Sequence, residues 1–244
     1  MMIENIVILT GAGISADSGL ATFRGADGLW CGHRVEDVAT PEAFARHPER
    51  VHDFYNQRRR QLAEVEPNAA HHALADLAAN WRGKCLLVTQ NVDDLHDRAL
   101  AAVTPSEGFS FLHMHGELAR ARCLDTGQCL PWHEDMTLDT SSPHTGRKGG
   151  LRPDIVWFGE IPIGMDSIHE AIENCDLFLS IGTSGKVYPA AGFVALARHA
   201  GAHTMEINLE PSDGVSFFEE RLYGRAIDKV PAYIASLLQK QQSR

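Results

Sequence analysis

The sequence has no apolar run long enough to span a membrane and no concentration of basic residues. Its first five residues lead directly into a strand-like apolar run, which leaves no room for a signal or transit peptide. Neutralising phosphate groups needs a basic surface, so the formal net charge of −10 argues against nucleic-acid binding and favours basic protein partners. We expect a monomeric, cytoplasmic protein with no membrane attachment.

Cysteine is also scarce, with five in 244 residues. The cysteines are odd in number and scattered, which does not fit a disulfide framework and is typical of a reducing compartment. Cys85 and Cys175 border apolar runs and are expected to be small buried side chains. The other three are Cys31, Cys123 and Cys129.

The alternation of apolar patterns predicts an α/β fold in a single domain. Strand-like runs lie at 6–9, 85–88, 111–114, 155–158, 177–181 and 204–209. Helix-like segments alternate with several of them, at 168–174, 189–200 and 231–239. Units of this kind assemble through right-handed crossovers into a Rossmann-like, doubly wound parallel sheet.

The chain between the first two strand-like runs is too long for a simple strand–helix–strand unit, so we expect an inserted smaller module. It should be helical and should include a loop-rich region like a zinc module. Thr40 and Pro41 fit a helix start, and a further helix is expected from Pro48 to about Val65. The expected large part spans about 1–24, 76–115 and 152–240, and the small module spans about 25–75 and 116–151.

The pattern Gly11-x-Gly13-x-x-Ala16 follows the first strand-like run and predicts a strand, a phosphate-binding turn and a helix. Glycines in such a turn let backbone N–H groups approach a pyrophosphate at the helix N-terminus. The alternative is a glycine-containing turn that binds nothing. A dehydrogenase should have a second strand within about 20 residues that ends in an acid for the ribose hydroxyl, and this chain has none.

Polar clusters follow three of the later strand-like runs, at 89–93, 182–185 and 208–210. Because ligands of open α/β sheets bind at the carboxyl ends of the strands, these clusters should converge on one crevice with the glycine turn. His115 follows another run and precedes a glycine. Its near-neutral pKa suits a general base, although a structural role is the alternative.

One charged residue lies on an apolar helix stripe. Val51, Tyr55, Leu62 and Val65 recur at helical spacing, and Arg58 falls on the same face. Arg58 could extend its charge to solvent or pair with a local acid. Its neighbours Arg59 and Arg60 are expected to be ordinary solvated charges.

Taken in order, these motifs resemble the sirtuin family over about residues 4–238. The matching residues are Gly11-Ala12-Gly13-Ile14-Ser15, Phe23-Arg24-Gly25, Gln90-Asn91-Val92-Asp93, His115-Gly116, Val156-Trp157-Phe158-Gly159-Glu160, Gly182-Thr183-Ser184 and Asn208-Leu209-Glu210. The chain looks most like bacterial members related to the desuccinylase and demalonylase class, because Tyr55-x-x-Arg58 stands where that class carries its acyl-reading pair.

The resemblance implies an enzyme that uses NAD to remove acetyl, succinyl or malonyl groups from protein lysines, releasing nicotinamide and O-acyl-ADP-ribose. Acylated lysine-containing proteins would be its partners. His115 would take a proton from a ribose hydroxyl, and Asn91 and Asp93 would complete the catalytic set in the nicotinamide pocket. Tyr55 and Arg58, at i and i+3 on one helix face, would reach the carboxylate of an acidic acyl group.

The resemblance also implies the binding residues. Those for NAD are Gly11, Ala12, Gly13, Ser15, Ala16, Thr22, Phe23, Arg24, Trp30, Gln90, Asn91, Val92, Asp93, Gly182, Thr183, Ser184, Asn208, Leu209, Glu210 and Ala226. Those for the acylated peptide are Tyr55, Arg58, Val156, Phe158, Gly159, Glu160 and Val187. Phe23 and Arg24 would cover the nicotinamide ribose, and Ala226 would lie near the adenine.

The match fails at the zinc site, for which most sirtuins have two cysteine pairs. Cys123 fits the first ligand position, but Cys129 follows six residues later and no further cysteine precedes residue 158. A tetrahedral site would need His133 or His144, in a spacing that matches no strong zinc pattern. We therefore expect no metal, with zinc bound through Cys123 and Cys129 as the alternative.

Two other functions use the same residues. A protein ADP-ribosyltransferase would share the NAD pocket and the loss of nicotinamide. A binding module that senses NAD or ADP-ribose would keep the pocket without the chemistry. His115, Asn91 and Asp93 are all present, which favours an active enzyme.

Overall fold

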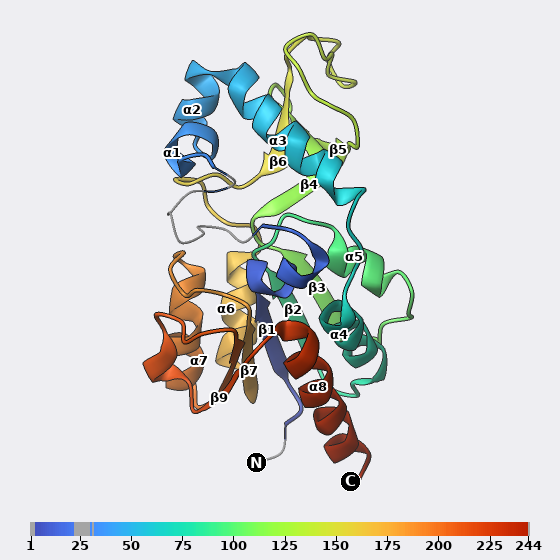
Figure 1. Cartoon of the computed structure of the whole chain (residues 1–244), viewed down its shortest axis with the longest axis vertical. Helices are drawn as coiled ribbons and strands as arrows, with labels where there is room; N and C mark the ends of the chain where they lie inside the picture. The colour runs from blue at the N-terminus through green and yellow to red at the C-terminus, as the bar shows by residue number, and fades with distance from the viewer. Residues whose placement is uncertain (1–2, 22–29, 31, 244) are drawn as a thin grey trace.

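The computed structural model describes residues 3–21, 30 and 32–243, which form a large part built on a parallel sheet and a smaller part beside it (Figure 1). The large sheet has six parallel strands in the order β3-β2-β1-β7-β8-β9. They are β1 (Ile6–Thr10), β2 (Cys85–Thr89), β3 (Phe109–His113), β7 (Leu177–Ile181), β8 (His203–Asn208) and β9 (Glu220–Tyr223). The expected Rossmann-like sheet is confirmed.

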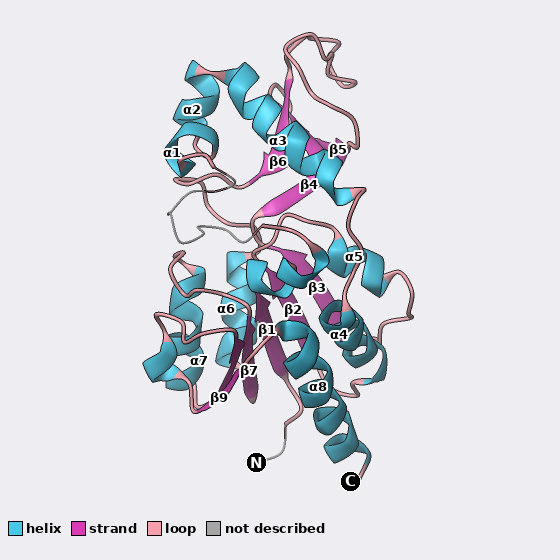
Figure 2. Cartoon of the chain, in the orientation of Figure 1, coloured by secondary structure: helices cyan, strands magenta, loops and turns pink. Residues whose placement is uncertain are grey.

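Helices cover both faces of this sheet (Figure 2). Side chains alternate along a strand, so Ile6 and Ile8 of β1 face one layer while Val7 and Leu9 face the other. The first layer contains α4 (Ala69–Asn80) and α8 (Ala226–Gln242), with α5 (Leu95–Leu100) beside α4. The second contains α6 (Met165–Glu173) and α7 (Phe193–His199). All five β1 residues are buried, as a strand covered on both faces should be.

The smaller part joins three helices to an antiparallel sheet of order β5-β4-β6. The strands are β4 (Gly116–Cys123), β5 (Cys129–Pro131) and β6 (Leu151–Ile155), and the helices are α1 (Val35–Val38), α2 (Pro41–Arg46) and α3 (Pro48–Leu62). Thr40 caps α2 as expected, because its hydroxyl accepts a 3.0 Å hydrogen bond from the backbone N–H of Ala43.

The structure moves several expected boundaries. The run at 155–158 is not a strand of the parallel sheet: β6 ends at Ile155 and pairs antiparallel with β4, so residues 151–155 lie in the small part. Helix α4 packs against α8, which places residues 69–75 in the large part. Helix α3 ends at Leu62 rather than near Val65, and α8 begins at Ala226, five residues before Pro231. Strands β4, β5 and β9 were not expected.

The helix expected after the glycine turn is absent from the described residues. Two short 3₁₀ turns take its place, η1 (Ala12–Ile14) and η2 (Ala16–Ser18), and similar turns form η3 (Ala190–Gly192) and η4 (Val215–Phe217). In η1 the N–H of Ser15 bonds to the carbonyl of Ala12, three residues back. Among the described residues no helix is both long and apolar enough to cross a membrane.

Candidate functional site

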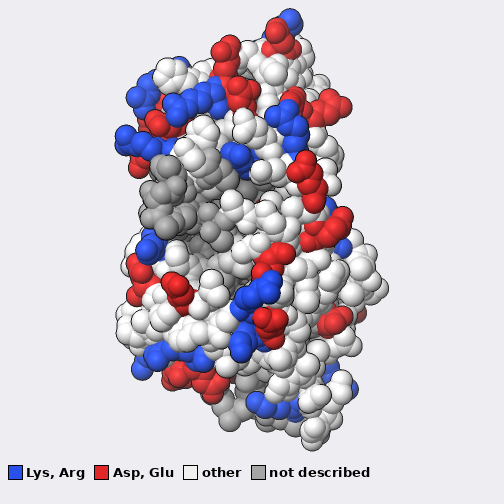
Figure 3. Space-filling model, in the orientation of Figure 1, with Lys and Arg blue, Asp and Glu red and all other residues white. Residues whose placement is uncertain are grey.

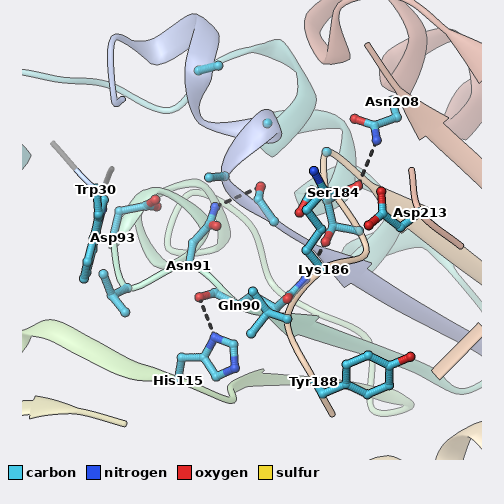
Figure 4. Close-up of a pocket in the computed structure, with 18 of the residues that line it drawn as sticks. Trp30, Gln90, Asn91, Asp93, His115, Ser184, Lys186, Tyr188, Asn208 and Asp213 are labelled. Carbon is cyan, nitrogen blue, oxygen red and sulfur yellow. Dashed lines mark hydrogen bonds between the residues drawn. The ribbon is translucent and has the colours of Figure 1, made fainter. Parts of the chain in front are cut away.

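A cavity of about 1070 Å³ lies at the carboxyl ends of β1, β2, β7 and β8 and extends to residues of the small part. Most of the residues expected to bind NAD line it (Figure 4), namely Gly11, Ala12, Gly13, Ala16, Trp30, Gln90, Asn91, Val92, Asp93, Gly182, Thr183, Ser184, Asn208, Leu209, Glu210 and Ala226. Ser15 lies behind this wall, fully buried. Thr22, Phe23 and Arg24 fall outside the described residues.

The glycines of the first turn are required by the way two turns pack together. A Cβ atom on Gly13 would lie 2.7 Å from the Cα of Gly182, and one on Gly11 would lie 2.9 Å from the carbonyl oxygen of Gly182. The N–H of Gly13 donates a 2.8 Å hydrogen bond to that same oxygen. The turn after β1 therefore packs directly on the turn after β7, which forms the floor of a cradle where a pyrophosphate would fit.

Asn91 and Asp93 meet at the hydroxyl of Ser15. Ser15 Oγ accepts a 3.1 Å hydrogen bond from Asn91 Nδ2 and donates one of 3.1 Å to Asp93 Oδ2. His71 Nε2 lies 3.4 Å from the same hydroxyl. Burial, only partly offset by hydrogen bonds from the N–H of Leu95 and from Ser15, raises the pKa of Asp93 to about 6.

His115 lies on the cavity wall with one ring nitrogen already engaged. Figure 4 shows its imidazole bonded to the carbonyl oxygen of Gln90, at an Nδ1 to oxygen distance of 3.1 Å. A carbonyl oxygen only accepts, so Nδ1 carries the hydrogen and Nε2 keeps its lone pair. Burial lowers the pKa of His115, despite the opposing effect of the Gln90 carbonyl, and this favours the neutral ring that a general base requires.

The far end of the cavity is closed by contacts that the sequence did not predict. Asn208 Nδ2 donates a 2.8 Å hydrogen bond to the carbonyl oxygen of Thr183, and this bond holds the ends of β7 and β8 together. Arg225, at the start of α8, binds Asp17 through Nε at 3.0 Å and Nη2 at 2.8 Å. This ion pair brings the turn after β1 to Ala226, where the adenine was expected.

The expected acyl-reading pair lies on α3. Tyr55 is fully buried and lines the cavity, and its hydroxyl accepts a 3.0 Å hydrogen bond from Trp157 Nε1. The guanidinium of Arg58 lies over the ring of Phe54, 4.4 Å from its centroid. Its Nε and Nη1 atoms are buried and have no hydrogen-bond partner among the described residues.

Arg59 corrects one expectation, because it is a buried side chain rather than a solvated charge. Its guanidinium donates to the carbonyl oxygens of Leu118 and Glu134 and to Asn56 Oδ1. Arg59 therefore joins α3 to β4 and to the loop after β5. Arg60 is exposed, as expected.

The other residues expected to bind the peptide lie on two segments that line the cavity, 156–160 and 186–189. The backbone of the first is fixed by two hydrogen bonds, of 2.9 Å from the N–H of Val156 to the carbonyl of His115 and of 3.0 Å from the N–H of Phe158 to that of Ala39. Val187 lies in the second. The sequence did not single out its neighbours Lys186 and Tyr188, although they follow the polar turn after β7.

Glu160, expected to contact the peptide, is engaged within the protein. Its carboxylate binds Arg152 at 2.7 and 2.8 Å and accepts a 2.8 Å hydrogen bond from the N–H of Trp157. The Arg152 guanidinium also lies 3.6 Å from the Trp157 ring centroid. Glu160 therefore fixes the conformation of segment 156–160 through contacts within the protein. Arg152 is a residue of the site that sequence reasoning missed.

The thiols of the small part do not fit a zinc site. Cys123 is buried and its sulfur accepts a 3.2 Å hydrogen bond from the hydroxyl of Ser142, whereas Cys129 is exposed. In the part of the chain that the structure describes, neither cysteine belongs to a group of three possible ligands whose donor atoms lie within 4.8 Å of one another. His133 and His144, the histidines that could have completed a site, do not form such a group either. Cys31 falls outside the described residues.

Comparisons with known proteins agree with this geometry. The model of the Sir2 family, the sirtuins, matches residues 11–189. An NAD-dependent protein deacylase of Bdellovibrio bacteriovorus is 54% identical over 240 residues, which cover 98% of each chain. One of Yersinia pseudotuberculosis is 54% identical over 235 residues, covering 96% of this chain and 82% of that protein. A solved Sir2 homolog–NAD complex is 34% identical, with a TM-score of 0.85 over 98% of this chain and 91% of that one.

Proposed function

This chain belongs to the Sir2 family and is an NAD-dependent protein deacylase, and we propose that it removes succinyl and malonyl groups from lysine as well as acetyl. The observation that carries the proposal is that Nε and Nη1 of Arg58 are buried with no hydrogen-bond partner among the described residues, one helix turn from Tyr55, which lines the cavity. Leaving guanidinium N–H groups buried without acceptors is costly. A carboxylate at the end of an acyl chain could pair with one edge of this guanidinium and so supply an acceptor that the described residues do not.

Different parts of the cavity would bind different parts of the NAD molecule. The turn at Gly11 and Gly13 would hold the pyrophosphate, and Asn208 and Ala226 would lie at the adenosine end. Asn91 and Asp93, tied together by Ser15, would line the nicotinamide pocket. The close approach of the glycine turns leaves no room for Cβ atoms, which fits a cradle shaped for phosphate groups.

In this mechanism bound NAD supplies a ribose whose bond to nicotinamide breaks as its C1′ accepts the acyl oxygen. His115 is the base, with Nε2 taking a proton from a ribose hydroxyl while Nδ1 stays bonded to the Gln90 carbonyl. Tyr55 and Arg58 hold the far end of the acyl group, which fixes the carbonyl for attack. One water is consumed, and free lysine and O-acyl-ADP-ribose would be the remaining products.

The substrate protein would bind as an extended strand between segments 156–160 and 186–189. This mode recognises backbone more than sequence, so many acylated lysines could enter. On the face shown in Figure 3, acidic and basic side chains are interspersed, and the net charge of −10 favours lysine-rich partners in general.

Matched acetyl-, succinyl- and malonyl-lysine peptides with NAD, analysed by product mass, test the proposal. Arg58→Met should lower kcat/KM for succinyl-lysine by at least about 30-fold and spare acetyl-lysine, because a buried charge pair is worth about 2 kcal/mol or more. Arg60→Met, on the exposed face of the same helix, is the matched control and should leave both rates unchanged.

Three other outcomes would contradict parts of this proposal. Equal losses on both peptides in Arg58→Met would mean that Arg58 is structural. ADP-ribose found on protein, in place of O-acyl-ADP-ribose, would favour an ADP-ribosyltransferase. Tight NAD binding without turnover on any peptide would favour a sensor.

A further inference from the structure

The loop at residues 89–92, which includes Asn91 of the expected nicotinamide pocket, accepts hydrogen bonds at its four consecutive backbone carbonyl groups. All four donors belong to residues 113–118. The N–H of Met114 donates to the carbonyl of Thr89 at 3.0 Å, and that of Leu118 donates to the carbonyl of Val92 at 2.8 Å. Between them, Gln90 and Asn91 are held by side chains, described next. Residues 113–118 therefore hold every backbone carbonyl of the loop at residues 89–92, while the Asn91 side chain is held by Ser15.

Two histidines, two residues apart, supply the side-chain contacts. His115 Nδ1 donates to the Gln90 carbonyl at 3.1 Å, and His113 Nδ1 lies 3.3 Å from the Asn91 carbonyl oxygen. The Nε2 atoms of the two histidines have different surroundings. His115 lines the cavity, whereas His113 is buried outside the cavity wall, with Nε2 2.9 Å from Asp97 Oδ2.

The partners of His113 determine its charge. A carbonyl oxygen and a carboxylate both only accept hydrogen bonds, so both ring nitrogens must carry a hydrogen. A neutral imidazole has one such hydrogen, and the ring that satisfies both partners is the imidazolium. His115, with a single acceptor, is satisfied as the neutral ring. The same strand end therefore carries one charged and one neutral histidine.

The groups around His113 agree with this assignment. Asp97 of α5 and Glu117 of β4 face its ring, and their donor atoms and Nε2 lie within 4.8 Å of one another. Asp93 also lies close enough to interact with its charge, while His96 is buried and its pKa is well below 6.5. Burial lowers the pKa of His113, but the hydrogen bond and charge of Asp97, with Glu117, raise it overall.

We propose that His113, charged and held by Asp97, is a positioning residue that fixes the Asn91 carbonyl and with it the nicotinamide pocket, so that its deprotonation sets the alkaline limit of activity. The proposal rests on the deacylase function. When the proton leaves, the remaining hydrogen stays on Nε2 against the charged Asp97 at 2.9 Å, so the Asn91 carbonyl loses its donor. A lone pair on Nδ1 would then face the carbonyl oxygen at 3.3 Å and push the Asn91 backbone away.

Asp97→Asn is the decisive variant. Asparagine keeps the shape and can still accept the Nε2 hydrogen bond, but it removes the charge that holds the proton on His113. Since a neighbouring opposite charge shifts a pKa by about one unit or more, the alkaline limb of the kcat/KM profile should move at least about one unit toward lower pH. The acidic limb, which reports His115 and Asp93, should stay in place. The Asp97 side chain is 42% exposed, so the fold should tolerate the change.

The matched control is Glu219→Gln. Glu219 Oε2 lies 2.7 Å from His203 Nδ1, which makes a second histidine–carboxylate pair on β8, and neither residue lines the cavity. The pH profile of the Glu219→Gln variant should match that of the wild type. His113→Gln is a second variant: it should lower kcat for an acetyl-lysine peptide at every pH and abolish the alkaline limb, because glutamine does not titrate.

Measurement with acetyl-lysine peptide keeps the result independent of Arg58 and of the acidic-acyl proposal. The ring resonances of His113, followed by NMR in the free enzyme without substrates, report its titration even if deacylation fails. A pKa above that of an ordinary histidine that falls in Asp97→Asn, together with the shifted alkaline limb, supports the proposal. An unshifted limb, or a neutral His113 at pH 7, overturns it, as does stoichiometric binding of Zn²⁺ to His113 in wild type.

Discussion

The hydroxyl of Ser15 donates a 3.1 Å hydrogen bond to Oδ2 of Asp93. Among the described residues only one other group donates to this carboxyl group, the N–H of Leu95. Two hydrogen bonds do not compensate for removal from water, and the pKa of Asp93 rises from 3.8 to about 6. At neutral pH the folded protein therefore holds a carboxylate that would be more stable in the unfolded chain.

This raised pKa predicts a stability that depends on pH. The folded state binds the Asp93 proton more tightly than the unfolded state, so its contribution is fully present below about pH 4 and is lost as the pH rises through about 6. Asp93→Asn should raise the free energy of unfolding at pH 8 by up to about 3 kcal/mol and have little effect near pH 4. Urea unfolding at both pH values checks this, and an equal change at the two would contradict it.

The same substitution should cost activity. Asparagine has one accepting oxygen and keeps only one of the two hydrogen bonds that Asp93 accepts, and it lacks the charge that faces the nicotinamide pocket, so kcat for deacylation should fall by about 10²-fold or more. A variant that is both more stable and fully active would show that Asp93 has no part in the chemistry.

The packing of the two glycine turns predicts a second stability effect. Gly13→Ala would place a Cβ atom 2.7 Å from the Cα of Gly182, and backbone must move to relieve that contact. The loss should be about 1–3 kcal/mol, with weaker NAD binding because the cradle opens. Gly192→Ala is the control, since the nearest atom to its Cβ would be 3.8 Å away on Tyr188. Equal stability of the two variants would contradict the packing argument.

These contacts also explain what the sequence could predict. Four branched aliphatics followed by a glycine turn specify a buried parallel strand, because that local pattern has few other uses. The polar clusters after the later strands lie where the rule for open α/β sheets places them. The crevice was therefore predictable from local patterns, whereas the strand order came from the structure.

Other features depend on partners distant in sequence. From the sequence alone Arg59 is expected to be a surface charge, because the carbonyl oxygens that accept its hydrogen bonds, those of Leu118 and Glu134, are distant in the sequence. The run at 155–158 has strand composition, but only Ile155 belongs to a strand, β6, which pairs antiparallel with β4. His113 lies in a plain apolar run, and only the fold brings Asp97 to it. No spacing rule in one sequence signals such pairs.

The small part should be insensitive to metal removal. Its loops are joined by hydrogen bonds and ion pairs: Ser142 binds the Cys123 sulfur, Arg147 pairs with Asp125, and Asn56 Nδ2 donates a 2.7 Å hydrogen bond to the carbonyl of Met136. Protein purified without chelator should contain no stoichiometric zinc, and EDTA should leave Tm and kcat unchanged. One zinc per chain, with a fall in Tm after chelation, would contradict this.

The acidic side of the pH profile should report Asp93, whose pKa is about 6, together with His115. Burial lowers the pKa of His115 below 6.5, so the ring stays neutral, and kcat/KM should hold as the pH falls to 6.5 and decline only below it. His115→Ala should reduce deacylation by about 10²–10⁴-fold, the usual value of a general base. Binding of NAD should persist, and isothermal calorimetry can measure it. An active His115→Ala variant would mean that another group removes the proton.

The Arg152–Glu160 pair should control peptide binding more than NAD binding. Its two side chains are 10% and 27% exposed, and Glu160 also fixes the N–H of Trp157 at the centre of the peptide segment. Glu160→Gln leaves the Arg152 charge poorly paired in a buried position, which should cost about 3 kcal/mol of stability. The peptide segment should loosen, so KM for the acylated peptide should rise severalfold while KM for NAD changes little. Exposed Glu134→Gln is the control. If both KM values rose together in Glu160→Gln, the damage would extend through the whole cavity, and a local role for Glu160 would be wrong.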